Sequence, residues 1–182
     1  TGIETVDVAA GESLRATTGE GPVEITSRET LPLDYVASDA GDVTIRALRG
    51  GGIESAAAGT NVRGDDVTLS VETGSVGADG APISIDSSAT ADGVVKVNAG
   101  QDVFLEETSG DLRVERIAAL GGDLEVGVDG GAVIDLNTAA TRDKRREAEL
   151  VGVWNEMALL DEGKSRAAID RRVEQEVAAY ER

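Results

Sequence analysis

The sequence lacks two residue types on which many enzymes and metal sites depend. Among its 182 residues there is no cysteine and no histidine. The chain can therefore form neither a disulfide framework nor a thiolate metal site. Imidazole-based nucleophilic triads and ordinary zinc sites are excluded within it for the same reason.

Aromatic residues are scarce, at 2% of the chain, whereas glycine occurs 23 times. The apolar fraction of 40% is still that of a folded protein. Valine, isoleucine, leucine and alanine must therefore make the core. Small and β-branched side chains with frequent glycine suit thin, closely stacked strands better than a globule built around large rings.

Positive charge is also scarce, and the formal net charge is −18. Up to Ala140 there are 25 acidic and 8 basic residues, whereas from Thr141 onward there are 10 and 9. We therefore expect two regions of different chemistry. A net charge this negative repels the phosphates of nucleic acid, so we expect no nucleic-acid partner. The chain also has no apolar run of about 18 residues, so we expect no membrane span.

A short unit that alternates apolar and polar residues recurs through the first three quarters of the chain. In VTIRA, the alternation predicts that Val43, Ile45 and Ala47 point inward and that Thr44 and Arg46 point outward. Glycine with aspartate, asparagine or serine separates the units. The clearest units are residues 23–27, 43–47, 67–71, 83–87, 94–99, 102–107, 111–115, 123–128 and 132–136.

Two architectures accommodate many short strands, an antiparallel sandwich or barrel and a β-solenoid. The long, varied breaks, the small inward residues and the recurrence of similar segments favour the solenoid. Coils of about 20 to 24 residues, stacked about 4.8 Å apart, would give about six coils over residues 1–137 and a rod of about 30 Å.

The repeat also predicts a register between successive coils. Val43, Ile45 and Ala47 should stack near Val67, Leu69 and Val71, and Ile53 should lie near Val76. An aspartate precedes the first inward residue of five strands, at Asp42, Asp66, Asp102, Asp111 and Asp123. Three of the four spacings are multiples of twelve. We interpret them as a coarse repeat with an irregular loop near Thr108, in which Asp42 lies one coil from Asp66.

Residues 138–182 follow a different pattern. Apolar residues recur there at helical spacing, which predicts two amphipathic helices at about 141–161 and 165–181. Neither helix can bury its apolar stripe alone. The expected interface residues in this helical hairpin are Trp154, Met157, Val173 and Tyr180.

The strings GDVTIRA, DDVTLSVETGSVGA and VVKVNAGQDVFLEETSGDLRVERI resemble the degenerate repeats of very large bacterial surface proteins with filamentous haemagglutinin-type repeats. This resemblance implies a right-handed parallel β-helix that is displayed outside the bacterial cell. The segment from Asp135 to Arg182 resembles the helical segments that interrupt such repeats. Because the first ten residues, TGIETVDVAA, have neither an initiator methionine nor a signal-peptide pattern, we also expect the chain to be a piece of a longer protein.

Acidic residues beside glycine raise the question of a calcium site. The candidates are Asp65, Asp66, Asp123 and Asp129, since Ca²⁺ takes several oxygen ligands. However, neither the glycine-rich nonapeptide pattern nor an EF-hand loop is present. Because aspartate also favours turns, we expect these residues to form turns, and we expect no cofactor.

Paired carboxylates such as Glu106 with Glu107 could serve a β-helical carbohydrate-active enzyme. Adjacent residues on a strand point to opposite faces, so this pair cannot converge on one bond. We therefore expect no enzyme. Phe104, predicted to point outward, is instead a candidate for a lateral interface.

The sequence as a whole predicts a mainly β protein, a β-solenoid followed by a helical hairpin. We expect it to act as a rigid acidic spacer, filament element or surface-layer element of an extracellular protein in adhesion or assembly. Its expected partners are neighbouring copies or adjoining segments of the same protein. The alternative is an adhesin module whose outer strands bind a glycan or a protein.

Overall fold

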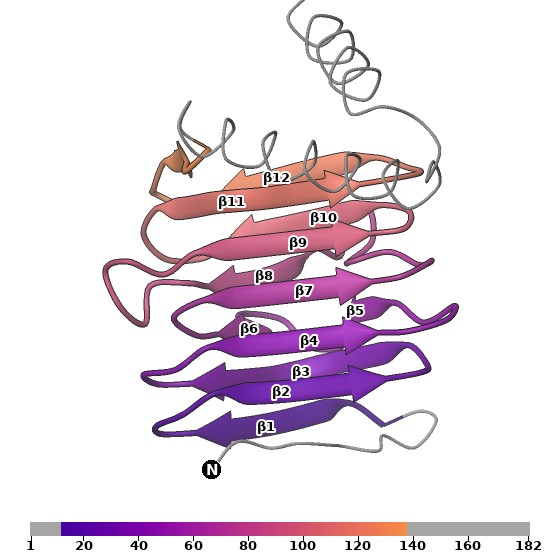
Figure 1. Cartoon of the computed structure of the whole chain (residues 1–182), viewed down its shortest axis with the longest axis horizontal. Coiled ribbons are helices and arrows are strands. Elements are labelled where there is room, and N and C mark those ends of the chain that lie inside the picture. The colour runs from indigo at the N-terminus through magenta and orange to yellow at the C-terminus, as the bar shows by residue number, and fades with distance from the viewer. Residues whose placement is uncertain (1–11, 138–182) are drawn as a thin grey trace, which may run out of the picture. The chain divides into compact units, whose positions relative to one another are not determined.

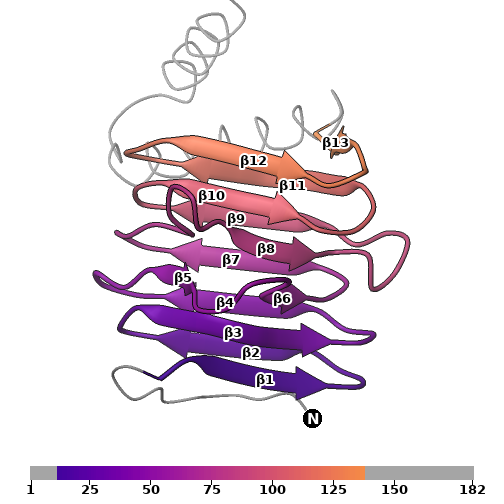
Figure 2. The same ribbon diagram turned by 180° about the vertical axis from the view of Figure 1, so that it is seen from behind.

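Residues 12–137 fold as a parallel β-solenoid of about six turns, as described by a computed structural model of the chain (Figure 1 and Figure 2). The chain divides into two units, Thr1–Leu136 and Asn137–Arg182. All described residues except Asn137 belong to the first unit. The expected helices at 141–161 and 165–181, with Trp154, Met157, Val173 and Tyr180, lie outside the described residues.

Each turn of the solenoid contributes to two sheets, and all the strand pairs are parallel. Sheet A follows the order β1-β3-β6-β8-β10-β12, with β5 also paired to β3, and sheet B follows the order β2-β4-β7-β9-β11-β13. The strands are β1 (Leu14–Thr18), β2 (Val23–Ser27), β3 (Leu31–Ser38), β4 (Val43–Ala47), β5 (Ile53–Ser55), β6 (Val62–Arg63), β7 (Val67–Val71), β8 (Ile83–Asp86), β9 (Val95–Ala99), β10 (Val103–Glu107), β11 (Leu112–Ala119), β12 (Leu124–Val128) and β13 (Val133–Asp135).

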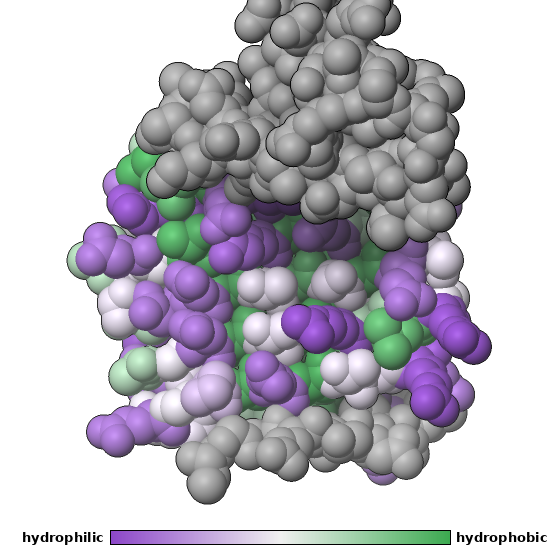
Figure 3. Space-filling model, in the orientation of Figure 1, coloured by the Kyte–Doolittle hydropathy of each residue, from purple (hydrophilic) through white to green (hydrophobic). Residues whose placement is uncertain are grey.

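The core lies between the two sheets. Alternate residues of each strand point into it, as in β4, where Val43, Ile45 and Ala47 are fully buried. The outward positions carry mainly polar side chains, and Figure 3 shows hydrophilic and neutral residues over much of the face formed by sheet B. The period of two that the sequence displays is therefore the period of a sheet with one buried face.

The predicted register between β4 and β7 is confirmed. The paired residues are Val43 with Val67, Ile45 with Leu69 and Ala47 with Val71. A parallel bridge also joins Ile53 to Val76. Like side chains therefore stack on like from one turn to the next, which keeps the core narrow.

The turns differ in length although their strands stay in register. In sheet B the aligned residues Val23, Val43, Val67 and Val95 are separated by 20, 24 and 28 residues. The additional residues leave the ladder as loops, including residues 57–60 between β5 and β6 and residues 87–94 between β8 and β9. The solenoid thus tolerates insertions, both at a corner and within one side of a turn, because the hydrogen-bonded positions keep their places in space.

The coarse repeat of twelve needs correction. Asp42, Asp66 and Asp111 lie at the corner where the chain leaves sheet A for sheet B, whereas Asp102 and Asp123 lie at the opposite corner. The short spacing between Asp102 and Asp111 therefore spans half a turn. Residues 108–111 form an ordinary four-residue corner between β10 and β11.

The last described turn leaves apolar side chains exposed. Leu124 and Val133 are 53% and 60% exposed. Their strands, β12 and β13, each pair with a described strand on one side only. Within the described residues, the last strand of each sheet therefore carries an exposed apolar side chain and pairs on one side only.

Close stacking at the corners predicts which glycines accept a side chain. A Cβ at Gly74 would lie 2.3 Å from the carbonyl oxygen of Gly51 in the turn below, whereas a Cβ at Gly19 would meet nothing within 4 Å. We expect Gly74→Ala to lower the free energy of unfolding by about 1–3 kcal/mol, as overpacking does, and Gly19→Ala to change it little. Urea denaturation of both variants tests this, and equal effects would contradict the proposed close approach.

Candidate functional site

The corner aspartates use their carboxylates to hold adjacent turns together. At the corner from sheet A to sheet B, Oδ1 of Asp42 accepts the backbone N–H of Asp66 at 3.3 Å, and Oδ1 of Asp66 accepts that of Val94 at 3.0 Å. Two turns further, Oδ1 of Asp111 accepts the N–H of Ala132 at 2.9 Å. Backbone N–H groups at a corner have no carbonyl acceptor on a neighbouring strand. The aspartate carboxylates supply the acceptor instead.

At the opposite corner, a carboxylate likewise accepts a backbone N–H from the next turn. Oδ1 of Asp102 accepts the N–H of Asp123 at 2.8 Å, and Oδ2 accepts the hydroxyl of Ser75 at 3.0 Å. The backbone N–H of Asp102 in turn donates to Oγ of Ser75 at 3.2 Å. Asp102 therefore connects the turn below with the turn above.

The calcium candidates are not brought together. Asp65 accepts a hydrogen bond from the hydroxyl of Thr90, and Asp66 is engaged with Val94. Asp123 and Asp129 are exposed at different corners of the last described turn. Within residues 12–137 no group of three or more acidic side chains is placed to hold a metal ion.

Phe104 points outward from β10, as predicted, and is half-buried between the inward residues Val103 and Leu105. It pairs in register with Glu125 of β12. Gly77 packs against it from the turn below, because a Cβ there would lie 3.2 Å from the Cβ of Phe104. The Cβ end of the Phe104 side chain therefore lies close to the turn below.

One buried side chain was not anticipated as a site by the sequence analysis. Glu107 ends β10 at a position aligned with the apolar residues Ile85 and Val128, and it is fully buried. Its carboxylate accepts the hydroxyl of Ser87 at 2.6 Å and the backbone N–H of Ser87 at 3.1 Å. The alternation from Val103 and Leu105 already places residue 107 inward, so the sequence contained the signal.

Burial controls the protonation of Glu107. Desolvation raises its pKa above the usual glutamate range, and the hydrogen bonds from Ser87 and Ser109 oppose this rise only in part. Asp86 adds a small further increase by charge repulsion. Glu106, its neighbour, is on the outward face of β10, so the two carboxylates do not share a site.

Asn61 forms a second buried polar centre. Its Nδ2 donates to the carbonyl oxygens of Leu33 at 3.2 Å and of Ala57 at 3.1 Å, while its Oδ1 accepts the N–H of Ser84 at 3.1 Å. The side-chain amide thus bridges β3 and β8 at the point where the loop 56–61 interrupts the strand between them. This role depends on tertiary position, and no local motif marks it.

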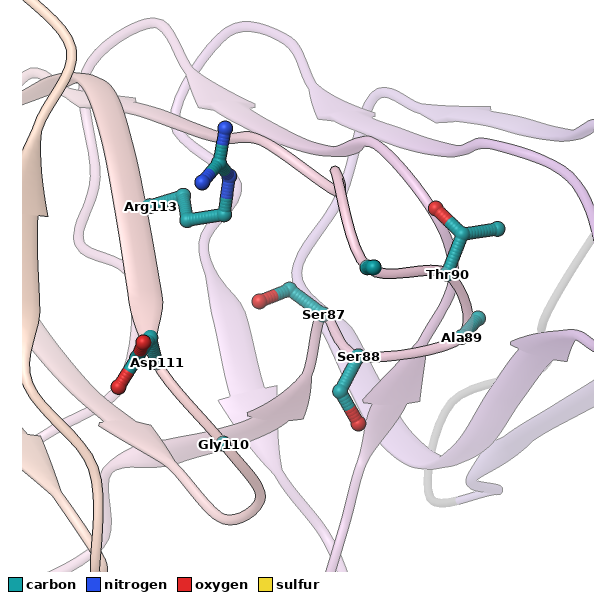
Figure 4. A pocket seen from close by; sticks show the side chains of 8 residues that line it. Ser87, Ser88, Ala89, Thr90, Gly110, Asp111 and Arg113 are labelled. Atoms are coloured by element: carbon teal, nitrogen blue, oxygen red, sulfur yellow. The ribbon is translucent and has the colours of Figure 1, made fainter.

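Among the surface pockets of the described solenoid are two of about 410 Å³ each. One is lined by Arg28, Leu48, Arg49 and Glu72. The other lies between the loop 87–94 and the start of β11, and Figure 4 shows Arg113 on one side of it and the Ser87–Thr90 segment on the other. The second pocket combines a cationic side chain with three hydroxyl-bearing residues.

Comparison with known proteins adds no functional assignment. No family model, no curated protein and no solved structure matches the chain. The part of the chain that the structure describes has no helix able to cross a membrane. The function must therefore be inferred from the geometry of the solenoid itself.

The corner carboxylates predict a measurable loss of stability when one is removed. Asp102→Ala leaves the N–H of Asp123 and the hydroxyl of Ser75 without their acceptor, and we expect a loss of about 1–3 kcal/mol in the free energy of unfolding. Asp102→Asn, which keeps one acceptor oxygen, should lose less. Asp129→Ala, at an exposed corner position, is the matched control. A loss no greater than that of the control would contradict the structural role of Asp102.

Glu107 predicts a pH-dependent contribution to stability. Between the ordinary glutamate pKa and its raised value, the folded chain holds more protons at Glu107 than the unfolded chain, so its contribution to stability falls as the pH rises. Lowering the pH from about 7.5 to about 5 should therefore stabilise the wild type relative to Glu107→Gln. Denaturation curves across this range measure the difference. Glu106→Gln, on the outward face of the same strand, should follow the wild type, and a pH-independent difference for Glu107→Gln would rule the effect out.

Proposed function

We propose that this chain is a structural repeat segment of a large extracellular protein, where it acts as a rigid acidic spacer or filament element on a bacterial cell surface. The observation that carries the proposal is the parallel pairing of every described turn with the next. Sheet B runs through six strands from β2 to β13 without a missing turn. Such stacking transmits force along the axis through many backbone hydrogen bonds at once.

The use of the acidic side chains supports this role. Asp42, Asp66, Asp102 and Asp111 each accept a backbone N–H from the next turn. Their carboxylates thus reinforce the rod. The many other acidic residues keep its surface strongly charged, which favours solubility of a long exposed protein.

We further propose that the solenoid is right-handed. In Figure 1 the strands of sheet B run to the right in front and those of sheet A run to the left behind, while the chain rises from β1 to β12. This path supports the right hand. Connections between parallel strands of one sheet have this hand in nearly all proteins.

The exposed upper edge supports continuation of the stack. Strand edges are templates for a further strand, and β12 and β13, which carry the exposed Leu124 and Val133, each pair with a described strand on one side only. An adjoining segment of the same protein or a neighbouring copy is the partner that we propose. Whether residues 138–182 cap the rod, space it or join it stays a prediction.

The alternative function is an adhesin module that binds a glycan or a protein. The pocket beside Arg113 is the observation that favours it. We propose no catalytic role, because Glu106 and Glu107 face opposite sides of β10. In the described residues, moreover, the aromatic side chains that could form a sugar platform are Tyr35 and Phe104 only.

The absence of cysteine makes rigidity directly measurable. Glu24 and Arg116 are exposed and occupy one outward column of sheet B, which passes through Thr44, Thr68 and Lys96. Spin labels on Glu24→Cys and Arg116→Cys should therefore be separated by four strand spacings, about 19 Å between backbones. Pulsed electron resonance should give one narrow distance distribution. A broad or multiple distribution, with the circular dichroism of the unlabelled chain retained, would overturn the rigid spacer.

The same proposal places the protein outside the cell. An antibody raised against the chain should label intact cells of the source organism, and external protease should remove the signal while a cytoplasmic marker persists. Labelling that requires permeabilised cells would contradict surface display.

A further inference from the structure

The corner between β8 and β9 differs from the other corners that connect sheet A to sheet B. It contains eight residues, 87–94, whereas the corresponding corners contain three or four. The extra residues swing outward and leave a pocket of about 410 Å³ against the following turn (Figure 4). This volume lies within the range of sites for small molecules. The lining residues are Ser87, Ser88, Ala89, Thr90, Ala91, Gly110, Asp111 and Arg113.

Arg113 provides the positive charge of this pocket. Its Nε atom is buried and has no hydrogen-bond partner in the described structure. Nε of Arg63 also lacks a hydrogen bond, but it lies 3.3 Å from a carboxylate oxygen of Asp86, and Arg15 likewise pairs with Asp34. A buried N–H without an acceptor costs about 1–3 kcal/mol. The buried Nε is out of reach of a ligand, but the ion pairs of the described residues do not include Arg113, so the charge of its guanidinium at the edge of the pocket is available to an anion.

The hydroxyl groups on the opposite wall provide hydrogen-bond acceptors. Ser87 donates its proton to Glu107, Ser88 donates to Asp86, and Thr90 donates to Asp65. Each proton is therefore committed to a carboxylate of the protein. Ser87 is buried, so the hydroxyls that can offer lone pairs to a ligand are those of Ser88 and Thr90, and they match a ligand that donates hydrogen bonds.

The two walls together define the chemistry of the ligand. A guanidinium prefers the paired oxygens of a carboxylate, and hydroxyl lone pairs prefer an O–H. We propose that this pocket binds a carboxylate that carries neighbouring hydroxyls, as in an acidic sugar or a sugar acid. Asp111 lies on the same side of the pocket as Arg113, and its negative charge makes the site only weakly attractive to an anion. Its carboxylate can also accept a hydrogen bond from a ligand hydroxyl. We therefore expect millimolar affinity.

The test uses the full chain labelled with ¹⁵N and follows the Nε–Hε signal of Arg113 at constant ionic strength. Glucuronate, added to about 50 mM, should shift this signal in a saturable manner. Glucose lacks the carboxylate and acetate lacks the hydroxyls, so each should bind at least about tenfold more weakly, a difference of about 1.4 kcal/mol. No saturable shift, or equal shifts with acetate and glucuronate, would overturn the proposal.

Matched variants separate the pocket from general charge effects. Arg113→Gln should abolish glucuronate binding, whereas Arg116→Gln removes an exposed arginine of the same strand outside the pocket and should leave it intact. Arg113→Lys keeps the charge without the planar fork and should bind weakly. Backbone amide spectra, unchanged away from β11, establish that each variant is folded. Binding that persists in Arg113→Gln would refute the assignment.

The source of the ligand is resolved in the same experiment. Methyl glucuronoside, which imitates a sugar unit within a polysaccharide, should bind as well as glucuronate if the natural ligand is a glycan. Gluconate should bind more tightly than either if the pocket takes a free sugar acid. Both results support the pocket's chemistry, and failure of all three compounds contradicts it without bearing on the rigid-spacer proposal.

Discussion

The hydrogen-bonded stacking of strands at a spacing of about 4.8 Å is the constraint on which the rest of this structure depends. A strand satisfies its N–H and C=O groups through the turns below and above it. A corner cannot do so, because its backbone turns away from the ladder direction. Asp42, Asp66, Asp102 and Asp111 supply the missing acceptors from their side chains. The acidity of the solenoid is thus partly a consequence of how its corners close.

The same spacing decides which side chains the core accepts. Each inward residue contacts its equivalents in the adjacent turns, so the columns consist mainly of valine, isoleucine, leucine and alanine. Glu107 departs from this rule within an otherwise apolar column. It is tolerated because Ser87 gives its carboxylate both a hydroxyl and a backbone hydrogen bond. A polar side chain is therefore accepted inside the column where the adjacent corner can satisfy it.

The period of two predicted the strands that are regular and the register of β4 against β7, since both follow from local alternation. It did not predict β6, which has two residues, Val62 and Arg63, too few to show a period. It also missed β3, where a register shift near Asp34 interrupts the alternation. The roles of Asn61 and Arg113 depend on segments that meet only after the coil has formed. Such contacts between turns have no local signature in the sequence.

The side chain of Asn61 affects how many residues one turn of the solenoid can contain. Its amide occupies the place of a peptide group in the ladder, bonded to Leu33 below and to Ser84 above. The residues between Ala56, whose N–H still bonds to Leu33, and Asn61 are therefore released from the ladder without a break in the stack. A single side chain thus allows loops of different sequence to be inserted within one side of the solenoid while every other turn keeps its position.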